Sequence, residues 1–157
     1  MRRLKPAQRP GVLRVIGNGH RVIRVVIVEN HQLVSESLGL LLGSQDDMEV
    51  VGKAGSVNEA TALPRHLSPD VVVMDFHLDD GTGPDAALAM REVFPNVRFV
   101  FLSRDGSDDA RLAAVEAGAS AYLLKSGPAS EVIDAIRKVA EGMTLITPTM
   151  IAGLVSR

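Results

Sequence analysis

The sequence contains no cysteine, so neither disulfide nor thiolate chemistry is available, and a reducing compartment is the simplest expectation. It also lacks any apolar run that approaches the length of about 18 residues needed to cross a bilayer. We therefore expect a cytoplasmic protein with no membrane partner.

Acidic side chains are missing from residues 1–24, which hold seven basic residues, whereas the rest of the chain holds ten basic and 19 acidic residues. An acidic body argues against a broad nucleic-acid surface, so we expect no direct DNA binding by this chain. The basic head does not suit a secretory signal, because Arg14 interrupts the only apolar stretch that follows, Val12 to Ile16. We expect residues 1–22 to be a flexible leader, with a functional basic arm as the alternative.

The length of 157 residues suits one compact domain. From Arg24 onward, short β-branched runs alternate with segments of helical period. The expected strands are Arg24–Val28, Glu49–Lys53, Asp70–Met74, Val97–Leu102 and Ser120–Leu124. Three of them are almost entirely apolar, which is typical of a parallel sheet covered by helices on both faces.

Helix boundaries are marked between these strands. Ser56 and Glu59 form a capping box at the start of the second expected helix, in which each side chain satisfies a free amide of the other residue. Pro64 falls inside this helix and should shorten or kink it. Ser107 is an N-cap candidate and Gly118 closes its helix. The last helix should run from Pro128 to Gly142, and its apolar stripe consists of Val132, Ile133, Ile136, Val139, Ala140 and Met143.

Five βα units predict an α/β fold, a three-layer α/β/α sandwich around a five-stranded parallel sheet. Right-handed crossovers leave few topologies, and the commonest small one has strand order 2-1-3-4-5. Its ligand crevice lies at the carboxyl ends of the first and third strands.

Polar side chains follow four of the expected strands. They are Glu29, Asn30, Asp75, Ser103 and Lys125. Taken singly, an acid after a strand is usually a turn or cap residue, and a lone lysine is usually solvated. Because all of them lie at the edge that a doubly wound sheet uses for ligands, we interpret them as one site.

This set of residues suits phosphoryl transfer to a carboxylate. Asp75 can act as the nucleophile and form an acyl phosphate. The charge that develops on the phosphoryl oxygens is stabilised by a divalent ion and a nearby cation. Glu29, Asp75 and the backbone carbonyl of His77 offer the oxygen ligands that Mg²⁺ prefers. The Lys125 ammonium and the Ser103 hydroxyl can contact the phosphate.

Over roughly residues 24–143 the sequence resembles the response-regulator receiver family, and it is closest to the NarL/LuxR-type transcription regulators. The segments that carry the resemblance are VVIVEN, VVVMDFHLDDGTG, FLSRDG and AGASAYLLKS. The resemblance implies a flavodoxin-like receiver fold and a phosphoprotein rather than an enzyme with an outside substrate. Asp75 would take its phosphoryl group from a histidine kinase in a two-component phosphorelay, and would lose it by slow autodephosphorylation.

The resemblance also gives roles to residues that are otherwise unremarkable. Tyr122 would be the switch aromatic that turns inward as Ser103 moves toward the phosphate. His77 and Asp105 match positions that tune phosphate lifetime. On the sequence alone, Tyr122 is a half-buried strand tyrosine, and the other two are loop residues.

Two positions depart from the family pattern. Asn30 stands where typical members have an acid that ligates Mg²⁺ directly, which predicts weak metal binding. Asp79 stands where a proline is usual, which predicts a looser loop. The first departure leaves a non-phosphorylated pseudo-receiver, acting as a protein-interaction module, as an alternative. A phosphohydrolase of the haloacid-dehalogenase type is disfavoured, because His77 occupies the place of its second acid.

We expect residues 23–143 to form the receiver domain and residues 144–157 to form a tail with a short capped helix. The tail resembles the segment that leads to the helix-turn-helix domain of NarL/LuxR-type regulators. The chain is therefore expected to be an excised receiver or a stand-alone one. Its expected partners are a histidine kinase, its own or a separate helix-turn-helix output domain, and a second copy in a homodimer.

Overall fold

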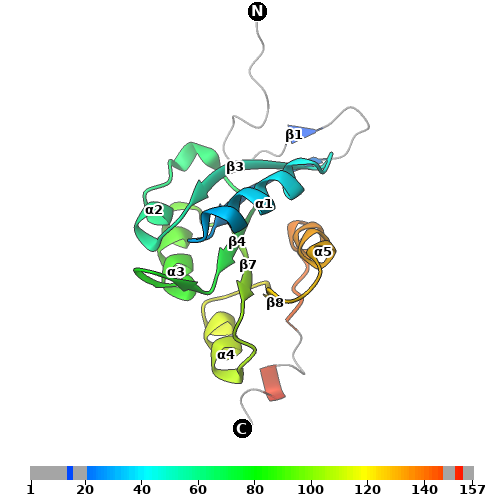
Figure 1. The fold of residues 1–157 in the computed structure, drawn as a ribbon. Helices are drawn as coiled ribbons and strands as arrows, with labels where there is room; N and C mark the ends of the chain where they lie inside the picture. Colours follow the sequence, from blue (N-terminus) through cyan, green and yellow to red (C-terminus); the bar gives the residue numbers. More distant parts are fainter. Residues whose placement is uncertain (1–13, 16–20, 147–150, 154–157) are drawn as a thin grey trace, which may run out of the picture.

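The computed structural model describes residues 14–15, 21–146 and 151–153 (Figure 1). Its strands are β1 (Arg14–Val15), β2 (Arg21–Val28), β3 (Met48–Ala54), β4 (Val71–Asp75), β5 (His77–Leu78), β6 (Gly81–Thr82), β7 (Arg98–Ser103) and β8 (Ala121–Leu124). Its helices are α1 (Gln32–Gly43), α2 (Val57–Thr61), a 3₁₀ turn (Arg65–Leu67), α3 (Gly83–Val93), α4 (Asp108–Glu116) and α5 (Ala129–Ala140). Among the described residues, no helix is both long enough and apolar enough to span a bilayer.

The parallel part of the main sheet has the order β3-β2-β4-β7-β8, which confirms the predicted order 2-1-3-4-5. The sheet has one further strand, since β1 pairs antiparallel with the start of β2 through Arg14 opposite Val22. Strand β2 begins at Arg21, so four residues of the expected leader, 14–15 and 21–22, belong to the sheet. The leader outside residues 14–15 and 21–22 lies beyond the described residues. In the tail, residues 151–153 are helical, where the short helix was expected.

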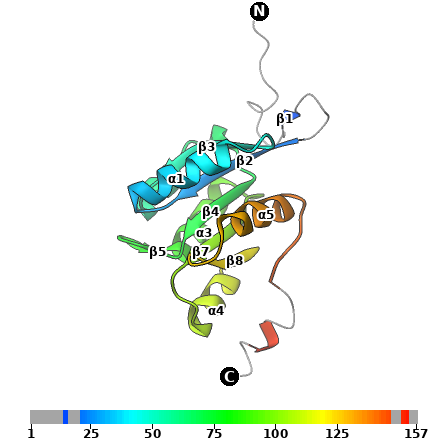
Figure 2. The same ribbon diagram turned by 45° about the vertical axis from the view of Figure 1, so that its right-hand side comes forward.

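Helices cover both faces of the sheet, with α1 and α5 on one face and α2, α3 and α4 on the other (Figures 1 and 2). Alternate residues of each central strand point to opposite faces. In β2, for example, Val26 and Val28 pack toward α2–α4, while Val25 and Ile27 pack toward α1 and α5. Both sets are fully buried, which explains the continuous apolar runs.

The capping signals of α2 are only part of what holds its first turn. The Ser56 hydroxyl accepts a hydrogen bond from the Glu59 amide at 3.1 Å, as the capping box predicts. The Glu59 carboxylate, however, accepts from this hydroxyl at 3.4 Å, where the capping box expects the Ser56 amide. Asp80, which follows β5, accepts from the Val57 and Asn58 amides at 2.8 and 3.0 Å. This second cap comes from a distant loop and was not predicted.

The other helix boundaries follow the expected residues, with one correction. Helix α2 ends at Thr61, and Pro64 precedes the 3₁₀ turn, so the predicted shortening is confirmed. Gly118 has φ of +81° and closes α4, because a left-handed backbone favours glycine. The predicted apolar stripe of α5 is wrong at Met143. Helix α5 ends at Ala140, and Met143 lies beyond this end with 47% of its surface exposed.

Candidate functional site

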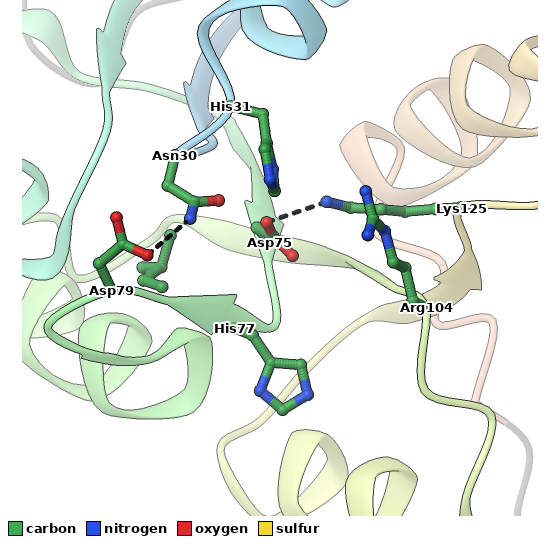
Figure 3. A pocket seen from close by; sticks show the side chains of 8 residues that line it. Asn30, His31, Asp75, His77, Asp79, Arg104 and Lys125 are labelled. Carbon is green, nitrogen blue, oxygen red and sulfur yellow. Dashed lines mark hydrogen bonds and ion pairs between the residues drawn. The ribbon is translucent and has the colours of Figure 1, made fainter.

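The predicted residues meet at the carboxyl edge of the sheet. A pocket of about 180 Å³ opens there between the ends of β2, β4, β7 and β8 (Figure 3). It is lined by Asn30, His31, Asp75, His77, Leu78, Asp79, Arg104 and Lys125. The parallel register places the end of β4 beside that of β7, with Asp75 opposite Leu102.

The Lys125 ammonium bridges two buried carboxylates. Its Nζ donates to Asp75 Oδ2 at 2.9 Å and to Glu29 Oε2 and Oε1 at 3.0 and 3.3 Å. Glu29 and Asp75 are only 3% and 5% exposed. Because buried charges are costly unless they are paired, one internal cation here compensates two acids only in part.

The two carboxylates respond oppositely to this arrangement. Burial alone would raise the pKa of Glu29, but hydrogen bonds from His31 and Lys125 outweigh it and hold the pKa below its ordinary value. Burial, together with the nearby charge of Glu29, raises the pKa of Asp75 despite its bond to Lys125. Asp75 is therefore the carboxylate that gains most from an additional cation.

Asn30 presents an unpaired oxygen to the pocket. Its Nδ2 donates to Asp79 Oδ1 at 3.1 Å, and since a carboxylate only accepts, this bond fixes the orientation of the amide. The oxygen lies on the side that faces Asp75 (Figure 3). Within the part of the chain that the structure describes, this buried Oδ1 has no hydrogen-bond partner. A buried acceptor that faces the Asp75 carboxylate fits a divalent cation such as Mg²⁺.

His31 is a site residue that the sequence reasoning missed. Its Nδ1 lies 2.9 Å from Glu29 Oε1, and its backbone amide donates to the same oxygen at 3.2 Å. Glu29, His31 and Asp75 each offer one ligand atom, and these atoms all lie within 4.8 Å of one another. The available signal was its place directly after Glu29 and Asn30. Arg104, directly after Ser103, also lines the pocket and was given no role.

Ser103 and Tyr122 meet beside this pocket through Asp105. The Ser103 hydroxyl is fully buried and accepts a hydrogen bond from the Asp105 amide at 2.9 Å. The Tyr122 hydroxyl donates to the Asp105 carbonyl oxygen, and its ring packs edge-on against Phe76. His77 lines the pocket, but its ring points away from Asp75 (Figure 3).

The loop after Asp75 is tied down more firmly than the missing proline suggests. Residues His77–Leu78 pair with Gly81–Thr82 as the short antiparallel hairpin β5–β6. Asp79 accepts from Asn30, and Asp80 caps α2. These hydrogen bonds are at odds with the looser loop expected from Asp79.

We expect Asp75→Asn to raise the melting temperature of the metal-free protein at pH 7. Two carboxylates about 4 Å apart repel by roughly 1 kcal/mol in water and by more in a buried site. Asp75→Asn should therefore raise the free energy of unfolding by about 1 kcal/mol. Because the pKa of Asp75 is raised in the folded protein, ionisation of this carboxyl group destabilises the fold. The stability that the protein has below the ordinary pKa of 3.8 is lost as the pH rises through the pKa of the folded state. The gain should therefore shrink as the pH falls toward that ordinary value.

Glu29→Gln is the matched control, with the opposite sign. The lowered pKa of Glu29 gives stability that is present above its ordinary value of 4.5 and is lost at lower pH. This variant should therefore melt earlier than the wild type at pH 7. Thermal denaturation in a chelator from pH 4 to pH 8 tests both variants. A lower melting temperature for Asp75→Asn at pH 7 would contradict the expectation.

Comparisons with known proteins agree on one family. The family model of the response regulator receiver domain matches residues 25–137. Response regulator protein VraR of Staphylococcus epidermidis is 31% identical over 135 residues, which are 86% of this chain and 65% of VraR. The DNA-binding transcriptional activator DevR/DosR of Mycobacterium tuberculosis is 35% identical over 136 residues, which are 87% of this chain and 63% of that protein. The chain thus spans just under two thirds of the length of these curated relatives.

A solved structure agrees with the sequence relatives. The crystal structure of a two-component response regulator of the LuxR family from Aurantimonas sp. is 29% identical and has a TM-score of 0.77. The match covers 87% of this chain and 99% of that one. The similarity therefore extends over nearly the whole of the described domain.

Proposed function

The chain belongs to the response regulator receiver domain family, and we propose that it is a phosphoacceptor switch in which Asp75 receives a phosphoryl group from a histidine kinase. One observation carries the proposal. Asp75 is buried and lines an open pocket, and its carboxylate lies 2.9 Å from the Lys125 ammonium. A carboxylate nucleophile beside a fixed cation is the arrangement that phosphoryl transfer needs.

In the transfer step, a carboxylate oxygen of Asp75 attacks phosphorus and forms the acyl phosphate bond as the bond between phosphorus and the kinase imidazole breaks. The electron pair of the broken bond leaves with the imidazole nitrogen. The Lys125 ammonium, already at the carboxylate, can follow the new negative charge onto the phosphate. Glu29, Asp75, the Asn30 Oδ1 and the His77 carbonyl would hold Mg²⁺, which supplies further neutralisation of that charge.

The switch that follows would use the group around Asp105. In the structure, the Ser103 hydroxyl is engaged by the Asp105 amide, so turning it toward a phosphate releases that loop. The Tyr122 hydroxyl holds the same loop through the Asp105 carbonyl, so both side chains would move together. By their positions two residues after Asp75 and Ser103, His77 and Asp105 would tune the phosphate lifetime.

The partners proposed are a histidine kinase, a helix-turn-helix output domain in this protein or a separate one, and a second copy in a homodimer, with this chain in the cytoplasm. Residues 23–143 would be the receiver unit, residues 1–22 a leader, and residues 144–157 a linker. DNA binding would belong to the output domain rather than to this chain. This arrangement is consistent with the names of the two relatives, a response regulator and a transcriptional activator.

A pseudo-receiver that acts only through protein contacts is the second candidate. It is favoured by Asn30, a neutral residue where an acid is usual, and by Lys125, whose ammonium bridges both carboxylates. In that case Lys125 would keep the two carboxylates paired permanently.

The two candidates differ in their reaction with a small phosphodonor. With acetyl phosphate and Mg²⁺, the wild type should gain one phosphoryl group, and Asp75→Asn should gain none. Asp79→Asn is the matched control, because it removes a carboxylate from the same loop and should still gain one group. Intact-mass spectrometry measures all three. An adduct on Asp75→Asn refutes the assignment, and no adduct on the wild type supports the pseudo-receiver.

A further inference from the structure

His31 occupies a helix-capping position but does not cap the helix. It is the N-cap of α1, where serine, threonine, aspartate and asparagine are preferred because their side chains accept from the first amides. The His31 side chain makes no cap hydrogen bond. Its imidazole points into the pocket toward Asp75 (Figure 3), and its Nδ1 contacts Glu29. Half of this side chain is exposed, so the ring can adjust without disturbing the core.

The ligand atoms of Glu29, His31 and Asp75 have the spacing of a metal site. Neighbouring ligands about 2.1 Å from one octahedral ion lie about 3 Å apart, and opposite ligands lie about 4.2 Å apart. The Nδ1–Oε1 distance is 2.9 Å, and the whole set lies within 4.8 Å. Small side-chain rotations would bring all three atoms to one ion. The ammonium of Lys125 already occupies a cation position between the two carboxylates.

The nature of these donors bears on which ion they hold. Mg²⁺ takes oxygen ligands and retains several waters, so it gains little from an imidazole. Divalent transition metals such as Fe²⁺, Ni²⁺ and Zn²⁺ suit imidazole nitrogen, and Mn²⁺, which suits carboxylate oxygen as Mg²⁺ does, can take a nitrogen ligand beside it. Asn30 contributes a neutral oxygen where a further carboxylate would favour Mg²⁺ by charge. The chain thus has one charge fewer than an all-acid site and one nitrogen donor more.

We propose that His31, Glu29 and Asp75 form a mixed nitrogen–oxygen site that takes a divalent transition metal in preference to Mg²⁺. The inference deepens the proposed function, since it concerns the metal of the same pocket. It requires only that the three side chains bind an ion together, and therefore it stands or fails separately from phosphorylation.

Mn²⁺ is the probe that tests the assignment. The unmodified chain should bind Mn²⁺ at least about tenfold more tightly than Mg²⁺, as measured by the loss of the free Mn²⁺ electron paramagnetic resonance signal and its recovery with added Mg²⁺. Electron spin-echo modulation of bound Mn²⁺ should show coupling to an imidazole nitrogen. His31→Gln should remove that coupling and weaken Mn²⁺ binding about tenfold or more, with Mg²⁺ binding changed less than about threefold.

His66→Gln is the matched control, because His66 is exposed on the 3₁₀ turn and does not line the pocket. It should keep both the nitrogen coupling and the preference for Mn²⁺. Equal loss of both metals in His31→Gln, or nitrogen coupling that persists in it, overturns the inference. Labelling of Asp75 by acetyl phosphate without any preference for Mn²⁺ overturns the inference and leaves the proposed function intact. Nitrogen coupling from His31 without labelling of Asp75 supports the inference and overturns the proposed function.

Discussion

Asn30→Asp should increase the affinity for Mg²⁺ at least about tenfold. The Asn30 oxygen already faces the pocket beside Asp75, so the substitution places a negative charge there without a change of shape. A unit charge about 4 Å from another is worth roughly 1 kcal/mol in water and about 4 kcal/mol at an intermediate dielectric, and Mg²⁺ carries two charges. Since about 1.4 kcal/mol corresponds to a factor of ten, even partial screening leaves the expected gain.

The same substitution should destabilise the metal-free protein. It replaces the Nδ2 donor that Asp79 accepts at 3.1 Å with a second carboxylate, so a hydrogen bond becomes a repulsion. The lost bond is worth about 1 kcal/mol, and crowding against Glu29 and Asp75 adds to it. We expect a loss of about 1–2 kcal/mol, or several degrees in melting temperature. Mg²⁺ should recover this loss because it binds the folded state.

The double variant N30D/D79N is the matched control. It restores an amide opposite a carboxylate, with the two groups exchanged, so it should recover most of the metal-free stability and retain the tighter Mg²⁺ binding. Melting curves with and without Mg²⁺ measure each effect. If Asn30→Asp alters neither the metal-free melting temperature nor the response to Mg²⁺, Asn30 does not belong to the metal site.

Gly83→Ala should be among the most damaging single-methyl substitutions in the domain. Gly83 is buried at the start of α3, and its amide donates to the Phe76 carbonyl at 2.7 Å. An added Cβ would lie 2.5 Å from the Asp75 carbonyl oxygen and 2.8 Å from the Phe101 ring. Overpacking of a core usually costs about 1–3 kcal/mol, and a clash with backbone lies at or above the upper end of that range. We therefore expect a loss of about 3 kcal/mol or more.

Gly43→Ala is the control that separates the effect of a steric clash from the general effect of replacing glycine by alanine in a helix. Gly43 is the last residue of α1, and nothing lies within 4 Å of an added Cβ. Alanine is favoured over glycine in a helix by up to about 1 kcal/mol, so this variant should be as stable as the wild type or slightly more stable. Urea denaturation of the three proteins measures the difference. Similar stabilities for Gly83→Ala and the wild type would mean that α3 does not lie so close to Asp75.

The strands and the centre of the site could be predicted because both depend on local patterns. Strands buried on both faces need continuous apolar runs, and parallel strands place their carboxyl ends at one edge. Those two rules alone bring Glu29, Asp75 and Lys125 together, and the structure places the Lys125 ammonium between the two carboxylates. Glycine and proline marked the helix ends for the same reason, since their effect on the backbone is local.

The features that were missed depend on side-chain direction and on partners far away in the sequence. His31 was passed over because nothing in the order of residues shows that its ring turns toward Glu29 rather than toward the helix. The firmness of the loop was missed because Asn30 and Asp79 are 49 positions apart. Met143 was misplaced because the apolar period continues for three residues after the backbone has left the helix.

The link between Asp80 and α2 has a consequence for how the domain opens. Asp80 lies five residues after Asp75 and accepts both of the first amides of a helix that is only five residues long. So short a helix has little stability of its own and depends on its contacts. If the loop lifts away, the first turn of α2 loses its partners and frays with it. The loop and α2 therefore form one cooperative unit of local unfolding, and a partner that grips either segment stabilises the other.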